Sequence, residues 1–223
     1  MISAVIFDLD ETLFARTSSL KAFAEDQLNN QYPNVFPTPS HVVARLLELD
    51  NRGKSSKYKV YQTLFKEFGI DDQNLAAELY DHYMRNAWRF AMPFEGLNEA
   101  FSEIRALGAK IGIVTNGRTD IQLRSLLALN LDRLADDYII SEAVGLRKPD
   151  AKIFQLAAGN LSVRTEDCVF VGDSPTADVS GAQTVGMKSV WFPNGAIWPT
   201  DLPTRADAEI QSLSELSGVL KAF

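Results

Sequence analysis

The chain has 223 residues, of which 46% are hydrophobic and 23% charged, as is ordinary for a globular protein with a substantial core. Its formal net charge of −7 argues against binding to nucleic acid polymers or to an anionic membrane surface. A single cysteine fits a reducing compartment, and no apolar stretch approaches the ~20 residues of a membrane span. We therefore expect a cytoplasmic protein that is a monomer or a small homo-oligomer.

The first predicted element is a short buried strand over residues 3–9, within the segment VIFDLDETLF. Three acids, Asp8, Asp10 and Glu11, stand where this strand ends. Like charges this close repel one another, and burying an unpaired one is costly. Strand alternation places Asp8 and Asp10 on the same side. The pattern predicts a site that requires positive charge at this end of the strand.

Residues 15–94 show apolar residues at helical spacing and no convincing strand. Stripes at Leu20–Leu28, Tyr61–Phe68 and Leu75–Ala87 predict an insertion of about four helices. The insertion also holds the basic segment RGKSSKYK, residues 52–59. This segment is either a solvated surface turn or a patch that attracts an anionic substrate.

Short β-branched runs then alternate with helical segments through the rest of the chain. Continuous apolarity predicts strands that are buried on both faces, and the alternation with helices predicts a parallel sheet. The fold class is therefore α/β, a Rossmann-like core formed by residues 1–14 and 95–223, with a helical domain at residues 15–94. The predicted strands after the first lie at residues 110–116, 137–141, 168–173 and 188–192.

A second predicted strand, CVFVGD, also ends on an acid, Asp173, and Asp178 follows five residues later. In open parallel sheets, ligands bind beyond the carboxyl ends of the strands. Two acidic strand ends there can share one hard cation, and Mg²⁺ prefers carboxylate, water and phosphate oxygens. The acids therefore predict a magnesium site.

Two other segments supply groups that bind anions. The strand ending IVTNG carries Thr115 and Asn116, a hydroxyl and an amide, and the loop GLRKPD carries Lys148. Asp150, after Pro149, is predicted to cap the next helix. Acids with a metal, a hydroxyl and a lysine form a site for an oxygen-rich anion, and phosphate fits best.

The segments DLDETL, VTNG, KPD and GDSPTAD, in this order, resemble the four signature motifs of the haloacid dehalogenase-like hydrolase superfamily. Each motif alone is weak, but all four in order between residues 8 and 178 are a specific signal. The insertion directly after the first motif is similar to the α-helical cap of one subfamily. That subfamily includes phosphoglycolate phosphatases, nucleotidases, β-phosphoglucomutases and haloacid dehalogenases.

The resemblance implies a role for each matching residue. Asp8 is the expected nucleophile, and Asp10 the general acid that later acts as the base for water. Asp8, the backbone carbonyl of Asp10, and Asp173 are the expected Mg²⁺ ligands. Many relatives have a glycine at the position of Glu11, so we expect Glu11 to face solvent without a catalytic role.

The remaining motif residues are expected to handle the phosphate. Thr115 and Lys148 would bind its oxygens, with Asn116 beside them. Asp178 would lie behind the site and position Lys148 or a metal-bound water. The cap would close over the site and exclude water during phosphoryl transfer.

These features predict a Mg²⁺-dependent phosphatase of a small phosphorylated metabolite: a nucleotide, a sugar phosphate or phosphoglycolate. A sugar-phosphate mutase would use the same core residues. A haloacid dehalogenase is a further alternative, although Asp10 argues against it because dehalogenases of this family generally lack an acid there. A catalytically silent binding module would not need the intact motif set.

Overall fold

The computed structural model describes residues 2–202 and 204–223. The chain forms two compact units, one made of Met1–Phe14 with Pro93–Phe223 and the other of Ala15–Met92. We name the first the core unit and the second the helical unit. The role of the helical unit as a cap stays a prediction.

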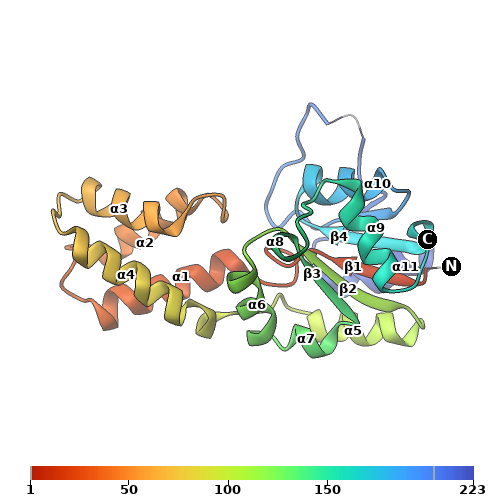
Figure 1. Ribbon diagram of the computed structural model, residues 1–223, viewed down its shortest axis with the longest axis horizontal. Coiled ribbons are helices and arrows are strands. Elements are labelled where there is room, and N and C mark those ends of the chain that lie inside the picture. Colours follow the sequence, from red (N-terminus) through yellow and green to blue (C-terminus); the bar gives the residue numbers. More distant parts are fainter. Residues whose placement is uncertain (1, 203) are drawn as a thin grey trace. The chain divides into compact units, whose positions relative to one another are not determined.

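The core unit contains a parallel sheet of six strands within the described residues, in the order β3-β2-β1-β4-β5-β6 (Figure 1). Five strands fall where continuous apolar runs predict them, which confirms the α/β fold class. The two-residue β6 is too short to leave a pattern in the sequence. The strands are β1 (Ala4–Phe7), β2 (Lys110–Thr115), β3 (Asp137–Ile140), β4 (Cys168–Gly172), β5 (Lys188–Trp191) and β6 (Ala208–Glu209).

Helices cover both faces of this sheet, which explains why its strands are apolar throughout. Phe154 of α9 packs on Phe170 of β4, with ring centroids 5.0 Å apart. Phe101 of α5 packs on Phe7 of β1 at 5.4 Å, on the opposite face (Figure 1). The helices are α5 (Leu97–Ala106), α6 (Thr119–Ala128), α7 (Leu131–Leu134), α8 (Ser141–Val144), α9 (Ala151–Asn160), α10 (Gly181–Gln183) and α11 (Leu216–Ala222).

The helical unit contains α1 (Arg16–Asp26), α2 (Pro39–Asp50), α3 (Lys57–Glu67) and α4 (Gln73–Asn86). Its four α-helices agree with the number that the apolar stripes predict. Their buried faces meet in one hydrophobic cluster that includes Phe23, Leu46, Tyr61, Phe65 and Leu79. This unit therefore has a core of its own.

Asp50 and Gln27 are buried polar residues among these helices. Asp50 forms ion pairs with Arg16, at 2.6 Å, and with Lys57, and it accepts a hydrogen bond from the backbone N–H of Gly53 at 2.9 Å. Gln27 accepts from the Tyr61 hydroxyl at 2.6 Å. The Gln27 amide nitrogen lies 2.8 Å from the Leu79 carbonyl oxygen and 3.2 Å from Nδ1 of His82.

The buried Asp50 corrects the prediction for the basic segment 52–59. Lys57 is only 8% exposed and ion-pairs with Asp50, so it belongs neither to a solvated turn nor to an open basic patch. Three successive residues, Asn51, Arg52 and Gly53, have positive φ and turn the chain back after α2. Arg52, Lys54 and Lys59 remain exposed.

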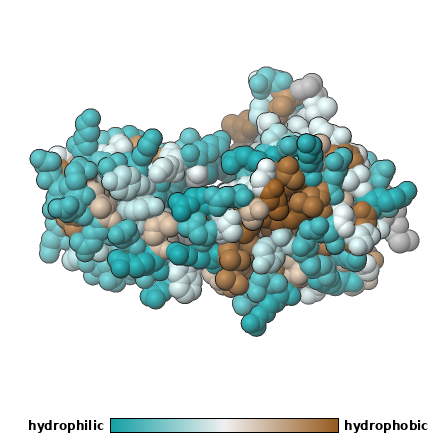
Figure 2. Space-filling model, in the orientation of Figure 1, coloured by the Kyte–Doolittle hydropathy of each residue, from teal (hydrophilic) through white to brown (hydrophobic). Residues whose placement is uncertain are grey.

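Apolar side chains gather on the face of the core unit that Figure 2 shows. Large apolar residues exposed in this unit include Leu127 and Val144. Such patches often mark contact sites, but the oligomeric state stays a prediction. None of the helices in the described part of the chain combines the length and the apolar character of a membrane span.

Candidate active site

The acidic strand ends meet at one edge of the sheet because β1 lies between β2 and β4. Phe7, at the end of β1, is in register with Ile113 of β2 and Val171 of β4. Asp8 continues from β1, and its N–H donates to the Val171 carbonyl oxygen at 2.9 Å. The topology thus brings the first, second and fourth motifs to the same edge.

Lys148 is 3% exposed and lies between two carboxylates. Its Nζ donates to Asp8 Oδ1 at 2.6 Å and to the Val114 carbonyl oxygen at 2.7 Å, and it lies 2.8 Å from Asp178 Oδ1. Burial disfavours its charged form, but Asp178 and Asp8 outweigh burial and raise the Lys148 pKa. Lys148 is therefore a fixed cation at neutral pH.

Three acids cluster at this site, and two of them, Asp8 and Asp178, contact the lysine. Oxygen atoms of Asp8, Asp173 and Asp178 all lie within 4.8 Å of one another. Burial raises the Asp8 pKa well above its ordinary value; Lys148 opposes the shift, and the charges of Asp178 and Asp173 add to it. Negative charge thus exceeds what Lys148 balances, and an all-oxygen donor set of this kind suits a hard divalent cation.

Asp178 approaches the site closely because residue 172 is a glycine. A Cβ atom on Gly172 would lie 2.5 Å from the Asp178 side chain. Asp178 Oδ2 accepts a hydrogen bond from the backbone N–H of Ser174 at 2.9 Å, which fixes the carboxylate. Its position against Lys148 fits the expectation that it orients this lysine.

Asn116 holds the lysine loop in place. Its Nδ2 donates to the Lys148 carbonyl oxygen, and its Oδ1 accepts from the Lys148 N–H, both at 2.9 Å. Asp150 accepts from the Lys152 N–H at 3.0 Å, which confirms it as the cap of α9. Direct contact between Asn116 and phosphate stays a prediction.

Thr115 ends β2 with its hydroxyl unsatisfied. The residue is 1% exposed, and its Oγ1 has no hydrogen-bond partner within residues 2–202 and 204–223. A buried polar atom without a partner costs about 1–3 kcal/mol, so it calls for an explanation. An oxyanion placed beside β2 would accept a hydrogen bond from this hydroxyl.

Asp10 has a partner that no sequence motif identified. Its Oδ2 accepts a hydrogen bond at 2.9 Å from Nε2 of Gln122, a buried residue of α6. The only signal in the sequence was a polar residue on a helix, which normally faces solvent. The contact joins residues 112 positions apart, so local patterns could not reveal it.

Glu11 contradicts its expected exposure, because it is only 4% exposed. It has φ 63°, and this left-handed turn directs the side chain into the protein. There its Oε2 accepts from Nδ2 of Asn194 at 2.6 Å. Glu11 therefore ties the first motif to the loop after β5.

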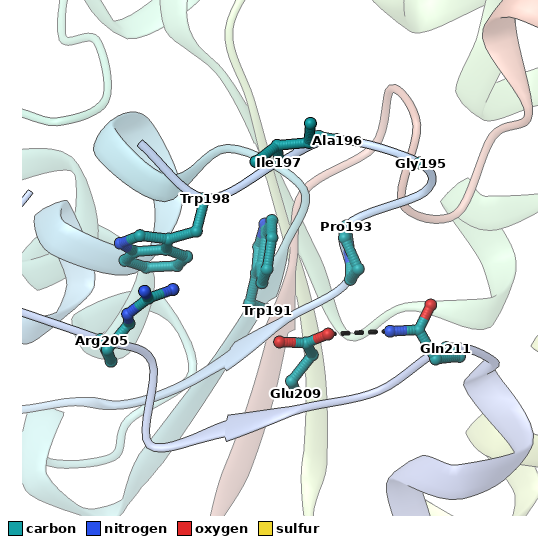
Figure 3. A pocket seen from close by; sticks show the side chains of 9 residues that line it. All are labelled: Trp191, Pro193, Gly195, Ala196, Ile197, Trp198, Arg205, Glu209 and Gln211. Carbon is teal, nitrogen blue, oxygen red and sulfur yellow. Dashed lines mark hydrogen bonds between the residues drawn. The ribbon is translucent and has the colours of Figure 1, made fainter. Parts of the chain in front are cut away.

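The loop after β5 also encloses a cleft of about 430 Å³, lined in part by Trp191, Trp198, Arg205 and Glu209 (Figure 3). None of the predicted site residues lines it. The Trp191 ring forms one wall, while its Nε1 donates to the Asp173 carbonyl oxygen at 2.9 Å. Trp191 thus supports the backbone of an acid in the site.

Comparisons with known proteins agree with this geometry. A glyceraldehyde 3-phosphate phosphatase of Methanopyrus kandleri is 28% identical over 219 residues, covering 94% of this chain and 91% of the relative. The structure of a HAD phosphatase from Thermococcus onnurineus is 28% identical, with 98% of each chain covered and a TM-score of 0.64. The structure of a 2-haloacid dehalogenase from Pseudomonas syringae pv. Tomato DC3000 is 30% identical. The match covers 100% of this chain and 99% of the dehalogenase chain, with a TM-score of 0.63.

The names of these proteins refer to different enzymes, so they do not fix one activity for this chain. The family model described as haloacid dehalogenase-like hydrolase matches residues 5–192, which include all four motifs. The match spans well over half of the chain. The protein belongs to the haloacid dehalogenase-like hydrolases.

Proposed function

We propose that this protein is a Mg²⁺-dependent phosphatase that hydrolyses a small phosphate monoester through an aspartyl-phosphate on Asp8. The observation that carries the proposal is the cluster of Asp8, Asp173 and Asp178, in which the buried Asp8 and Asp178 also contact Lys148. A lysine and a metal together stabilise the charge of a transferring phosphoryl group. The unpartnered Thr115 hydroxyl supplies a donor for one of its oxygens.

Asp8 and Asp173 would hold the cation, with the backbone carbonyl of Asp10 as the third protein oxygen. When bound, the metal neutralises the acidic cluster and polarises the phosphoryl oxygens. Lys148 and Thr115 orient the phosphate, while Asn116 and Asp178 hold Lys148. Burial, with the charges of Asp178 and Asp173, disfavours the ionised form of Asp8, and a bound cation would stabilise that form.

The reaction then needs one nucleophile and one proton donor. The Asp8 carboxylate attacks phosphorus, and the bond from phosphorus to the leaving oxygen breaks as Asp10 protonates that oxygen. In the second step Asp10 takes a proton from water as the water attacks the phosphorus. Free phosphate leaves, and Asp8 is regenerated.

The substrate class is a small phosphorylated metabolite. The triose phosphate that names the M. kandleri relative is one candidate, and nucleotides and phosphoglycolate are others. We propose that the helical unit acts as the cap that selects the leaving group. A sugar-phosphate mutase would differ from a phosphatase because its turnover would depend on a sugar bisphosphate and would not release phosphate. We expect the protein to work in the cytoplasm.

The second candidate function is dehalogenation, which would need no metal. The P. syringae relative is named a 2-haloacid dehalogenase. Asp10 favours the phosphatase, because dehalogenation does not require an acid to protonate a leaving alkoxide. The two reactions also differ in their dependence on metal, which gives a direct test.

The test measures phosphate release from a panel of phosphorylated metabolites, with and without Mg²⁺. Chelator should abolish release and Mg²⁺ should restore it, whereas Ca²⁺ should support little turnover because its looser coordination misplaces the nucleophile. Asp173→Asn should lose activity and weaken Mg²⁺ binding, while Glu99→Gln, an exposed acid of α5, should change neither. Full activity in chelator, or haloacid turnover without metal, would contradict the proposal.

A further inference from the structure

Gln122 is a buried amide that touches the proposed acid, Asp10. It is 4% exposed, and its Nε2 donates to Asp10 Oδ2 at 2.9 Å and to the Asn116 carbonyl oxygen at 3.3 Å. The residue lies in the first turn of α6, a helix of ten residues in the core unit. Rigid elements hold side chains in place more accurately than loops do.

The two contacts fix which way the amide faces. Both neighbours of Nε2 are oxygen acceptors, so a flipped amide would place its own oxygen against them. The Gln122 Oε1 atom is buried and has no hydrogen-bond partner in the part of the chain that the structure describes. A leucine of similar volume would avoid that unpaired oxygen, so packing alone does not explain a glutamine here.

The glycine of the VTNG motif makes room for this amide. A Cβ atom on residue 117 would lie 2.6 Å from Gln122 Nε2 and 2.9 Å from its Cγ. Contacts under 3.0 Å require the side chain to move. The absence of a side chain at Gly117 therefore allows the Gln122 amide to lie where it contacts Asp10.

We propose that Gln122 is a positioning residue for general acid–base catalysis by Asp10. Its N–H group occupies Oδ2 as a hydrogen-bond donor, so the proton that Asp10 exchanges is carried on Oδ1. This inference rests on the proposed phosphatase function, in which Asp10 is the acid and then the base.

The assignment gives each step a defined proton path. As Asp8 bonds to phosphorus and the leaving oxygen departs, the proton moves from Oδ1 of Asp10 to that oxygen. As water then attacks the aspartyl-phosphate, its proton returns to Oδ1. Gln122 gives up no proton and touches no reacting atom in either step.

The dependence on leaving group distinguishes this role from a structural one. A p-nitrophenolate departs without a proton, whereas an alkoxide needs one. Loss of proton donation therefore slows alkyl phosphates far more than p-nitrophenyl phosphate. We would measure kcat and KM for p-nitrophenyl phosphate, phenyl phosphate and glycerol phosphate, with Mg²⁺ present, in the wild type and in variants.

For Gln122→Leu we expect kcat/KM for glycerol phosphate, which reports the step that expels the leaving group, to fall by roughly 10–100-fold, a share of the usual contribution of general acid–base catalysis. The kcat/KM for p-nitrophenyl phosphate should change by less than about 3-fold, because that leaving group needs little of the same contribution. Hydrolysis of the aspartyl-phosphate uses Asp10 with every ester, so a fall in kcat that all three esters share reports that second step. Gly117→Ala should show the same selectivity, since it displaces the amide without replacing it.

The matched control is Ser125→Ala on the same helix. Ser125 is buried, and its hydroxyl contacts only the Ile121 carbonyl oxygen of the preceding turn, at 3.5 Å, among the contacts described for that side chain. This variant should keep wild-type kinetics with all three esters. Melting temperatures of all variants would show that each one is folded.

Asp10→Asn provides the reference. It should show the same leaving-group selectivity in stronger form, and adding Gln122→Leu to it should cause no further loss. If Asp10→Asn is selective but Gln122→Leu and Gly117→Ala are not, the positioning role is wrong while the proposed function stands. If Asp10→Asn shows no selectivity, or the wild type releases no phosphate, the proposed function fails and this inference fails with it.

Discussion

The core unit and the helical unit both bury charged and polar side chains, but they satisfy them differently. In the helical unit, the Asp50 carboxylate has two cations and a backbone N–H group. Both amide atoms of Gln27 have partners, on Tyr61, Leu79 and His82. Here the chain itself supplies partners for both Asp50 and Gln27.

At its candidate site the core unit leaves some buried polar groups incomplete. Oxygen atoms of three carboxylates lie within 4.8 Å of one another, only Asp8 and Asp178 among them are paired with Lys148 in the salt bridges described, and burial raises the Asp8 pKa. The Thr115 hydroxyl and the Gln122 carbonyl oxygen are buried with no hydrogen-bond partner among the residues that the structure describes. Native proteins satisfy nearly all buried polar atoms, so such exceptions point to function. We infer that the buried polar groups of the helical unit stabilise its fold, whereas those at the candidate site of the core unit bind a ligand.

The largest effect should follow from Asp8→Asn, because an amide is a poor nucleophile. We expect kcat to fall by at least about 10⁴-fold, as is usual when a covalent nucleophile is removed. The melting temperature without metal should stay level or rise, since the change removes a carboxylate whose ionised form burial disfavours. Phosphate release and thermal melting check the two expectations.

Two results for Asp8→Asn would contradict the difference that we draw between the core unit and the helical unit. A variant that keeps a tenth of the wild-type rate would show that the covalent step is wrongly assigned. A large fall in melting temperature would mean that Asp8 stabilises the fold as Asp50 is expected to.

The sequence predicts most of the fold and the meeting of the motifs. Apolar runs identify five strands, and the rule that ligands bind beyond strand carboxyl ends brings Asp8 and Asp173 together. These inferences succeed because each depends on local periodicity or on topology. The two residues of β6 carry no periodicity at all.

Side-chain pairing between distant segments was not predictable from the sequence. Lys57 looks like any solvated lysine until a left-handed turn brings it to Asp50. Glu11 looks exposed because its partner, Asn194, lies 183 residues away. Burial of a polar residue depends on which partner the tertiary structure supplies, and one sequence does not show that.

The second effect concerns stability. Asp50→Ala leaves Arg16 and Lys57 without their shared carboxylate inside the helical unit. Breaking a buried ion pair on one side typically costs about 3–5 kcal/mol, so we expect a loss of that order in the free energy of unfolding. Denaturant unfolding, followed by a probe in the helical unit, measures it.

An exposed pair in the same unit gives the matched control. Glu67 pairs with Arg45 at 2.8 Å, and both side chains are more than a third exposed. Surface pairs contribute about 0–1 kcal/mol, so Glu67→Ala should change stability little. Equal effects of the two substitutions would show that Asp50 is not the group that anchors the turn after α2.

The smallest effect should be a pH dependence of the helical unit through His82. Burial, together with the nearby charge of Arg85, lowers the His82 pKa from its ordinary value. The unfolded chain therefore binds more protons between the lowered and the ordinary pKa, so the helical unit loses stability as pH falls through that range. The geometry agrees, because Nδ1 of His82 lies 3.2 Å from the donor Nε2 of Gln27 and accepts a hydrogen bond from it only when the ring is neutral.

Melting temperatures across this pH range should fall more steeply for the wild type than for His82→Gln. His41→Gln, at an exposed histidine of α2, should match the wild type. If the melting temperature depends on pH equally in the wild type and in His82→Gln, protonation of the His82 ring does not weaken the helical unit. The hydrogen bond between Gln27 and His82 would then contribute little to its stability.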